Sequence, residues 1–476
     1  MKSTFAFPDQ HPVDLAIIIL YIVANAAIGF FTFRRRKKGV SASDEFLLAG
    51  RTLTLPAFVA TLVSTWYGGI IAVGEYVYDN GIVTWIVFGV PYYFAALIFA
   101  FVLAKRVNSD RVHVSIPDRM RAVYGPRAGY LGAVATSFMT SPASYLMMLG
   151  TLYQWFFGLS YWTGIAIAIV TSISYLFSGG FRSSIHTDIL QFIVMFVGFV
   201  VIIPYCFSTL GGFGYLGSHL PASHKAPFGG FSIWYVMVWY IAALATLVDP
   251  NVHTRVFAAR SSGVAKWGMI VSVFFWLFFD FMTNVAGLYA KAVFPNLAES
   301  KFAYPALAEA ILPIGMKGLF YAGMTATVLS TVDSFFFMSA TIIGRDILWR
   351  IFGGSEEQSV KRFTRIGLFV TAIISVIIAA LSERIYLIWY SFASVLVPML
   401  LLPLTASYFP KFKPKKHMAE LTMIAGGGTA LIAYLAGIIR GNSIKPDYIF
   451  GIEPMYIGLI ASALVFLVGW EKQRSK

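Results

Sequence analysis

Residues 323–334 read Gly-Met-Thr-Ala-Thr-Val-Leu-Ser-Thr-Val-Asp-Ser, in the middle of an apolar segment that runs from 318 to 342. At about 100° per residue, four hydroxyl residues of this stretch share one face of a helix: Thr327, Ser330, Thr331 and Ser334. Asp333 lies about 60° to the side of Ser330. Polar side chains inside hydrocarbon are costly and usually face a pathway or another helix. The stretch therefore predicts a membrane helix with one functional face; the alternative is that small hydroxyl residues only let helices pack closely.

The composition of the whole chain agrees with a membrane setting. Of its 476 residues, 58% are hydrophobic and 12% are charged, with a mean hydropathy of +0.73. A soluble domain carries about 25% charged residues, so the composition excludes a soluble enzyme, a disordered protein and a disulfide scaffold. The single cysteine, Cys206, cannot form a disulfide within the chain. We predict an all-α polytopic membrane protein.

Thirteen apolar segments are long enough to be membrane spans, since a span needs roughly 20 residues. They are 15–33, 56–77, 82–104, 128–157, 161–177, 188–207, 231–248, 267–290, 318–342, 366–381, 385–408, 421–439 and 452–470.

The net charge of +14 would suggest a nucleic-acid partner in a soluble chain. The placement of the charges gives a better explanation. If the N-terminus is outside, 28 of the 36 Lys and Arg residues fall in cytoplasmic loops, as the positive-inside rule requires. We therefore predict a multi-pass protein of the plasma (inner) membrane, with its C-terminus in the cytoplasm, surrounded by membrane lipid and binding no nucleic acid.

The second apolar segment has a weak point at its middle. Gly68 and Gly69 disfavour a continuous helix, because glycine loses the most backbone entropy on ordering. Interrupted helices in carriers free backbone carbonyls that bind a cation near the bilayer midplane. Trp66 and Tyr67, just before the glycines, would offer ring faces and a hydroxyl to a solute. The alternative is a glycine pair that serves packing, beside two core aromatics.

Three aspartates elsewhere attract attention. Asp188 is expected to start the helix of the sixth segment, where a carboxylate favours the helix dipole. Asp280 lies deep in the eighth segment, where an unpaired carboxylate is costly. It binds solute or pairs with Asn284, one turn further on. Asp249, followed by Pro250, indicates a helix terminus.

Catalytic motifs are missing from the sequence. It contains no Walker A loop, no His-Glu-x-x-His and no Gly-x-Ser-x-Gly nucleophile elbow. We therefore do not expect an enzyme.

Several short motifs occur in a defined order: Phe46-Leu-Leu-Ala-Gly-Arg51, Ser178-Gly-Gly-Phe-Arg182 with Thr187-Asp-Ile-Leu-Gln191, Thr254-Arg-Val-Phe-Ala-Ala-Arg260, Ser330-Thr-Val-Asp-Ser334 and Gly344-Arg-Asp346. Together they resemble the sodium/solute symporter family, whose members include sodium-coupled proline, pantothenate, sialic acid and sugar carriers. The resemblance covers most of the chain.

The resemblance implies a core of two inverted repeats of five helices each, with discontinuous helices. It divides the chain into an N-terminal extra helix with a basic cytoplasmic loop (1–52), a first repeat (53–207), a second repeat (208–410) and two peripheral C-terminal helices (411–476). The seventh span shows no Gly or Pro before Pro250 that would interrupt it.

The resemblance also implies cation sites. A sodium site would be formed by the carbonyls of Ala60, Val63 and Thr327 and the hydroxyls of Ser330 and Thr331. The matching positions of a second cation site, which some members possess, are Asp188, Ser330, Asp333 and Ser334. Hard oxygen donors of this kind suit an alkali cation. Asp333 replaces the serine or threonine usual in second-site members, and its carboxylate either strengthens cation binding or favours a proton.

The solute site departs from the sugar carriers. Their Glu-Gln pair aligns with Trp66 and Tyr67, and their Tyr-Trp pair aligns with Thr246 and Leu247. A sugar would lose hydrogen-bond partners at both places. Our candidates for the solute site are Trp66, Tyr67, Thr246 and Asp280.

These observations predict a secondary active transporter that couples the entry of a small organic solute to sodium by alternating access. One alternative is a proton-coupled carrier of the same fold, acting through Asp188 or Asp333. Another is a transporter-like sensor, which would carry a cytoplasmic output domain; the sequence up to Lys476 shows none.

Overall fold

A computed structural model describes residues 10–31, 42–352, 357–382, 385–442 and 446–474. The basic run 34–38, which we assigned to a cytoplasmic loop, lies outside these described residues. Ten helices in the described part are long and apolar enough to cross a membrane. The described backbone is helical apart from loops and one isolated bridge between Leu53 and Ala259.

The first half of the chain contains the expected interruption in its second span. Its helices are α1 (Pro12–Phe31), α2 (Ala42–Leu48), α3 (Leu55–Trp66), α4 (Ile70–Asn80), α5 (Val90–Ile98), α6 (Ala104–Ser109), α7 (Ile116–Tyr124), α8 (Pro126–Met139), α9 (Ala143–Phe157) and α10 (Tyr161–Leu210). The 3₁₀ turn η3 (Tyr67–Gly69) separates α3 from α4 at the glycine pair. The predicted break is confirmed.

The second half contains another interruption, which the sequence did not indicate. Its helices are α11 (Phe213–His219), α12 (Ala222–Lys225), α13 (Ile233–Ala242), α14 (Pro250–Ala258), α15 (Ser262–Val293), α16 (Ala303–Ile311), α17 (Met316–Thr341), α18 (Arg350–Phe352), α19 (Glu357–Leu381), α20 (Ile385–Ser407), α21 (Lys416–Arg440) and α22 (Pro454–Arg474). After α13 the chain tightens into the 3₁₀ turn η6 (Ala243–Leu247), and α14 begins only at Pro250. The seventh span is therefore discontinuous without any glycine.

Short 3₁₀ and π segments complete the backbone. They are η2 (Ala49–Arg51), η4 (Trp85–Gly89), η5 (Phe99–Leu103), η7 (Ser300–Phe302), η8 (Ile342–Trp349), η9 (Pro410–Phe412) and η10 (Ile449–Gly451).

Two segment boundaries differ from expectation. The fourth segment, 128–157, is divided between α8 and α9, where Pro142 precedes the first turn of α9. The fifth and sixth segments are joined in the 50-residue helix α10, which kinks at Gly180 with a φ of 61°. Glycine tolerates that conformation without the Cβ penalty, so the helix bends and continues. With the last segment, whose described apolar helix Pro454–Trp470 is shorter than the other spans, these differences explain why ten long apolar helices correspond to thirteen expected spans, a number that stays a prediction.

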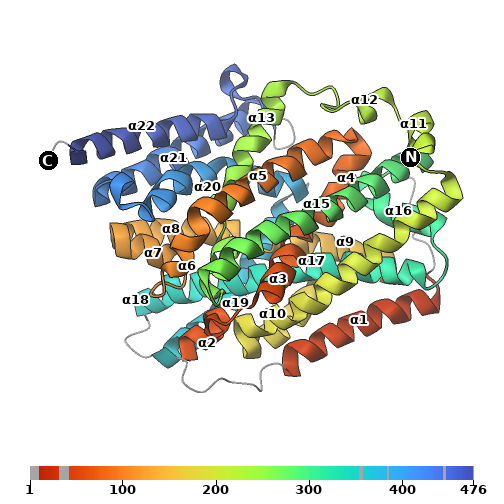
Figure 1. Cartoon of the computed structure of the whole chain (residues 1–476), viewed down its shortest axis with the longest axis horizontal. Helices are drawn as coiled ribbons and strands as arrows, with labels where there is room; N and C mark the ends of the chain where they lie inside the picture. Colours follow the sequence, from red (N-terminus) through yellow and green to blue (C-terminus); the bar gives the residue numbers. More distant parts are fainter. Residues whose placement is uncertain (1–9, 32–41, 353–356, 383–384, 443–445, 475–476) are drawn as a thin grey trace.

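Helix α17 lies at the centre of the molecule (Figure 1). Residues 320–346 are all buried. Helix α10 packs along it so closely that a Cβ on Gly198 would lie 2.9 Å from the Cα of Gly323. Helix α1 packs against α10 and α17 at one edge, whereas α20, α21 and α22 pack together at the opposite edge. This arrangement surrounds the polar stripe of α17 with α3, α10 and α14.

Candidate functional site

The hydroxyl stripe of α17 faces the end of α3, as the helical spacing predicts. Ser330 Oγ donates a hydrogen bond to the carbonyl of Ser64 at 2.7 Å, and Thr331 Oγ1 donates to the carbonyl of Thr65 at 2.7 Å. Ser330 Oγ also lies 3.0 Å from the carbonyl oxygen of Thr327. Five oxygen atoms from two helices therefore gather where the second span is interrupted.

The register differs slightly from the set that the family resemblance implies. Ala60 and Val63 lie on the preceding turn of α3 and are buried. The hydrogen bonds described for Ser330 and Thr331 reach carbonyls of α3 one and two residues beyond Val63. The two helices are thus joined directly, hydroxyl to carbonyl.

Gly68 permits this close approach. A Cβ built on it would lie 2.1 Å from Thr331 Oγ1, a distance that no side chain can occupy. The glycine pair therefore has a packing function as well as interrupting the helix.

A buried arginine lies beside this contact. The guanidinium of Arg255, on α14, is fully buried and its Nη2 forms an ion pair with Asp188 Oδ2 at 3.2 Å. It donates further hydrogen bonds to Thr61 Oγ1 at 2.8 Å, Thr65 Oγ1 at 2.6 Å and Ser334 Oγ at 3.0 Å, and to the side chain of Asn251. Arg255 thus connects four helices: α3, α10, α14 and α17.

Asp333 has separate partners. Its Oδ2 accepts hydrogen bonds from the hydroxyl of Tyr175 and from Gln191 Nε2, the latter at 3.4 Å, both on α10. Its Oδ1 is buried and has no hydrogen-bond partner in the described part of the chain. Asn25, on α1, donates to the hydroxyl of Tyr175 at 3.4 Å.

The four residues of the second predicted cation site therefore do not all meet at one point. Asp188 and Ser334 meet at the Arg255 guanidinium, Ser330 bonds to α3, and Asp333 bonds to α10.

Asp188 does not start a helix, contrary to our expectation. It lies within α10, two turns beyond the kink at Gly180. The helix dipole therefore does not explain this carboxylate, whereas its ion pair with Arg255 does.

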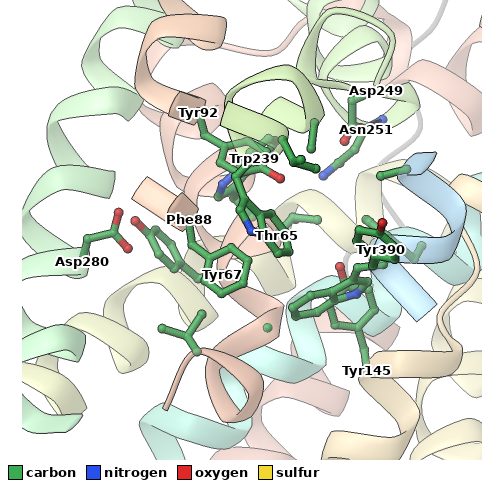
Figure 2. A pocket seen from close by; sticks show the side chains of 18 of the residues that line it. Thr65, Tyr67, Phe88, Tyr92, Tyr145, Trp239, Asp249, Asn251, Asp280 and Tyr390 are labelled. Carbon is green, nitrogen blue, oxygen red and sulfur yellow. Dashed lines mark hydrogen bonds between the residues drawn. The ribbon is translucent and has the colours of Figure 1, made fainter. Parts of the chain in front are cut away.

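A cavity of about 200 Å³ lies next to the two helix interruptions. Three of the four candidate solute residues, Trp66, Tyr67 and Asp280, line it. Thr246 is buried in η6, its hydroxyl has no hydrogen-bond partner among the described residues, and it does not line the pocket. Figure 2 shows Asp280 at one side of the pocket and Asp249 with Asn251 at the other.

The carboxylate of Asp280 interacts with a tyrosine rather than with Asn284. Its Oδ2 accepts a hydrogen bond from the hydroxyl of Tyr93 on α5. Asn284 Nδ2 instead donates to the backbone carbonyl of Asp280 at 2.8 Å. The expected pairing of this carboxylate with Asn284 is therefore not formed, and the carboxylate instead connects α15 to α5.

Sequence reasoning missed Asp249 and Asn251 as lining residues. Asp249 is the N-cap of α14, as the helix-terminus interpretation predicts, because its Oδ1 accepts from the amides of Asn251 and Val252 at 2.6 and 3.3 Å. The Asp-Pro-Asn sequence signalled the cap, but only the break before α14 brings these side chains to the pocket.

Aromatic residues from distant helices form most of the remaining wall. They are Phe88, Tyr92, Tyr145, Trp239, Phe335, Trp389 and Tyr390. Tyr145 packs against Trp389 with ring centroids 5.9 Å apart, and Trp66 stacks on Trp276, behind the wall, at 4.8 Å. In a chain with 17% aromatic residues, nothing in the sequence distinguishes these rings from core packing.

Comparison with protein-family models assigns the chain. The model described as "Sodium:solute symporter family" matches residues 46–413. The chain belongs to the sodium:solute symporter family. With its apolar helices, this membership makes it a multi-pass protein of the plasma membrane, in a family of transporters rather than enzymes.

Individual relatives differ in the solutes that they are named for. The Escherichia coli sodium/pantothenate symporter is 25% identical, over 95% of this chain and 95% of that protein. The Drosophila melanogaster high-affinity choline transporter 1 is 24% identical, over 96% of this chain and 78% of that protein. Human sodium/glucose cotransporter 4 is 25% identical over 77% of this chain, which spans only 60% of that protein.

Solved structures share the fold. A sodium-coupled sialic acid symporter in a substrate-bound, outward-open state superposes with a TM-score of 0.77 at 18% identity, covering 98% of this chain and 99% of that one. A nucleobase-cation-symport-1 family transporter gives a TM-score of 0.59 at 13% identity, over 91% of this chain and 95% of that one.

Proposed function

We propose that the protein is a sodium-coupled symporter that carries a small organic solute into the cell by alternating access. The observation that supports this most directly is the contact between the α17 hydroxyls and the α3 carbonyls. It places Thr327, Ser330 and Thr331 against an interrupted helix, and these oxygen donors suit an alkali cation.

Sodium would bind at this contact, with Ala60 and Val63 contributing carbonyls from the neighbouring turn of α3. A hydroxyl can coordinate a cation through an oxygen lone pair while its proton still bonds to a carbonyl. Sodium would therefore join the existing bonds from Ser330 to Ser64 and from Thr331 to Thr65. The ion would thus help to hold α3 and α17 together at this contact.

The solute would bind in the adjacent pocket, which includes Trp66, Tyr67 and Asp280, while Thr246 belongs to η6. The interruption η3 packs against α17 and also lines the pocket through Tyr67 and Gly69, whereas η6 lies between the lining residues Ala242 and Asp249 in the chain. Sodium and solute would then favour the same arrangement of α3 and assist each other's binding.

Movement of one inverted repeat, 53–207, against the other, 208–410, would expose both ligands to the cytoplasm. One positive charge moving through 100 mV releases about 2.3 kcal/mol. With the N-terminus outside and the membrane negative inside, inward sodium movement would drive solute accumulation.

The four positions that match the second cation site of some family members have a different environment in this chain. The Arg255 guanidinium contacts Asp188 and Ser334 and so supplies a fixed positive charge at two of the four positions. Asp333 has no ion pair with another described residue. We infer that a second monovalent cation would bind at Asp333, without Asp188 and Ser334, and that sodium is the ion.

The test is uptake of labelled solutes, including pantothenate and choline, into proteoliposomes with sodium or potassium outside. Ser330→Ala combined with Thr331→Ala is expected to abolish the sodium-dependent part. Ser272→Ala is the matched control, because among the described residues its hydroxyl bonds only to Gly268 of its own helix. Unchanged sodium dependence in the double variant would contradict the proposed ion site.

One observation favours the proton-coupled alternative, namely the buried Asp333 carboxylate bonded to a tyrosine hydroxyl. A proton gradient imposed without sodium separates the two functions. If a proton gradient alone drives uptake, the coupling ion is a proton and not sodium.

A further inference from the structure

The charge of the pocket and the ring faces of its wall favour one class of solute. We propose that the solute is an organic cation with a methylated or alkylated ammonium group, held by the aromatic wall and by Asp249. This inference rests on the proposed function for the direction of transport. The binding that it predicts can be measured without transport.

The wall offers ring faces more than polar groups. Nine of its nineteen described residues are aromatic. Several of these rings use their polar atoms elsewhere: Trp389 Nε1 donates to Ser144 Oγ at 3.0 Å, Tyr67 donates to the carbonyl of Trp276 at 2.6 Å, and Tyr390 donates to Glu453. An ammonium group is attracted to such faces, within about 6 Å of a ring centroid, by the ring quadrupole.

The charge of the pocket has one sign. Asp249 and Asp280 line it, and none of the described lining residues is basic. Arg255 lies next to the wall, but its charge is paired with the buried Asp188. The described lining residues therefore supply no positive charge that would hold an anionic solute.

Two of the polar side chains that line the pocket are already bonded to Arg255. Thr65 Oγ1 accepts a hydrogen bond from Arg255 at 2.6 Å, and the side-chain oxygen of Asn251 accepts another. A buried solute hydroxyl without a partner costs free energy. This wall therefore suits alkyl groups around a positive charge better than a polyol.

Asp249 is placed to act as the counter-charge. Its Oδ1 is occupied by two backbone amides of α14, whereas its Oδ2 accepts no hydrogen bond from the described residues. The rings of Tyr92 and Tyr145 line the same pocket as this carboxylate. An ammonium group bound in the pocket would lie among these two rings and Asp249, all labelled in Figure 2.

Binding to the purified full-length protein tests this proposal with three probes: choline, its neutral isostere 3,3-dimethylbutan-1-ol, and anionic pantothenate. Titration is followed by tryptophan fluorescence in sodium and in potassium, because Trp66, Trp239 and Trp389 line the pocket. We expect choline to bind about 10-fold or more tightly than the isostere, and pantothenate not to bind.

Two variants separate charge from shape. Asp249→Asn keeps an N-cap acceptor of the same size, since asparagine caps helices as well as aspartate does, and should bring the ratio between choline and the isostere close to one. Phe88→Leu removes one ring face and should lower choline binding more than isostere binding. Asp447→Asn, at an exposed ion pair with Arg440, and Phe369→Leu, on the exposed face of α19, are the matched controls.

The outcomes distinguish the two proposals. Choline binding that is equal in sodium and potassium supports the cation site and contradicts sodium coupling. Sodium-dependent binding of pantothenate, or equal binding of choline and its isostere, overturns the cation site and leaves sodium coupling intact. An unchanged ratio in Asp249→Asn also overturns the assignment of that carboxylate.

Discussion

Arg255 and Asp188 form an ion pair at 3.2 Å in which both side chains are fully buried, far from each other in sequence but together at the centre of the helix bundle. Removing two charges from water is costly, so a pair of this kind persists only where further hydrogen bonds satisfy it. Thr61, Thr65 and Ser334 provide these bonds to the guanidinium. Because Arg255 touches the interrupted spans and α17 together, its position ties the geometry of the ion contact to that of the pocket.

Breaking this pair from either side should be strongly destabilising. Arg255→Gln leaves a buried carboxylate unpaired, and Asp188→Asn leaves a buried guanidinium unpaired. Each is expected to cost about 3–5 kcal/mol of unfolding free energy. The combined variant should cost less than the sum of the two, because it leaves no lone charge. Thermal unfolding in detergent measures the cycle. If the two single effects simply add, the residues do not act as a pair.

Close packing of α10 on α17 predicts a second effect. Gly198→Ala would place a Cβ 2.9 Å from the Cα of Gly323, so the helices must separate. Overpacking of this kind costs about 1–3 kcal/mol. Gly428→Ala, within α21 and with no atom within 4 Å of the new Cβ, is the control and should be neutral or stabilising. The midpoint of thermal unfolding should fall for the first variant only; an equal fall in both would contradict the packing explanation.

The sequence predicted those features that depend on local pattern. The hydroxyl face of α17 follows from helical spacing alone, and the break at Gly68 follows from the weak helix propensity of glycine. Asp280 was recognised because a carboxylate within an apolar span needs a reason. Each of these signals lies within a few residues of the chain.

Features that depend on pairing between distant segments could not be predicted in the same way. Arg255 follows a helix start and precedes another basic residue, so by sequence it belongs to a cytoplasmic loop. Only the break between η6 and α14 turns its side chain inward to Asp188. The aromatic wall is hidden for a related reason, since Tyr145, Trp239 and Trp389 come from three separate helices.

Outside the membrane spans, Asp110 predicts a pH effect on stability. Burial raises the pKa of its carboxyl, but hydrogen bonds and charge from His113, together with the Arg119 guanidinium, lower that pKa from 3.8 to about 2. Because the folded state lowers this pKa, the charged carboxylate stabilises the fold at pH values above its ordinary pKa. This stability is lost as the pH falls from about 4 to about 2. After allowance for solvent screening, the contribution is about 1–2 kcal/mol.

Asp110→Asn should therefore be less stable than the parent chain at pH 5. The difference should shrink below pH 4, because the parent carboxyl is then losing its charge. Asp447→Asn, at an exposed ion pair, serves as the comparison and should show little difference at any pH. A difference between parent and Asp110→Asn that grows on acidification would contradict the sign of the effect.

The last prediction concerns Asp333, whose carboxylate bonds to Tyr175 and Gln191 and forms no ion pair with another described residue. A lone buried carboxylate favours a mobile cation as its partner. If that partner is a second sodium ion, uptake depends on more than one sodium and rises steeply with its concentration. Asp333→Asn keeps the size and hydrogen-bonding ability of the side chain but removes the charge. We expect the sodium dependence of uptake to become shallower, with a Hill coefficient near one, and half-saturation to require more sodium. Ser339→Ala, on the same helix but bonded to Thr371 of α19, should retain the parent curve. An unchanged sodium curve in Asp333→Asn, accompanied by loss of the pH dependence of uptake, would identify the partner of this carboxylate as a proton.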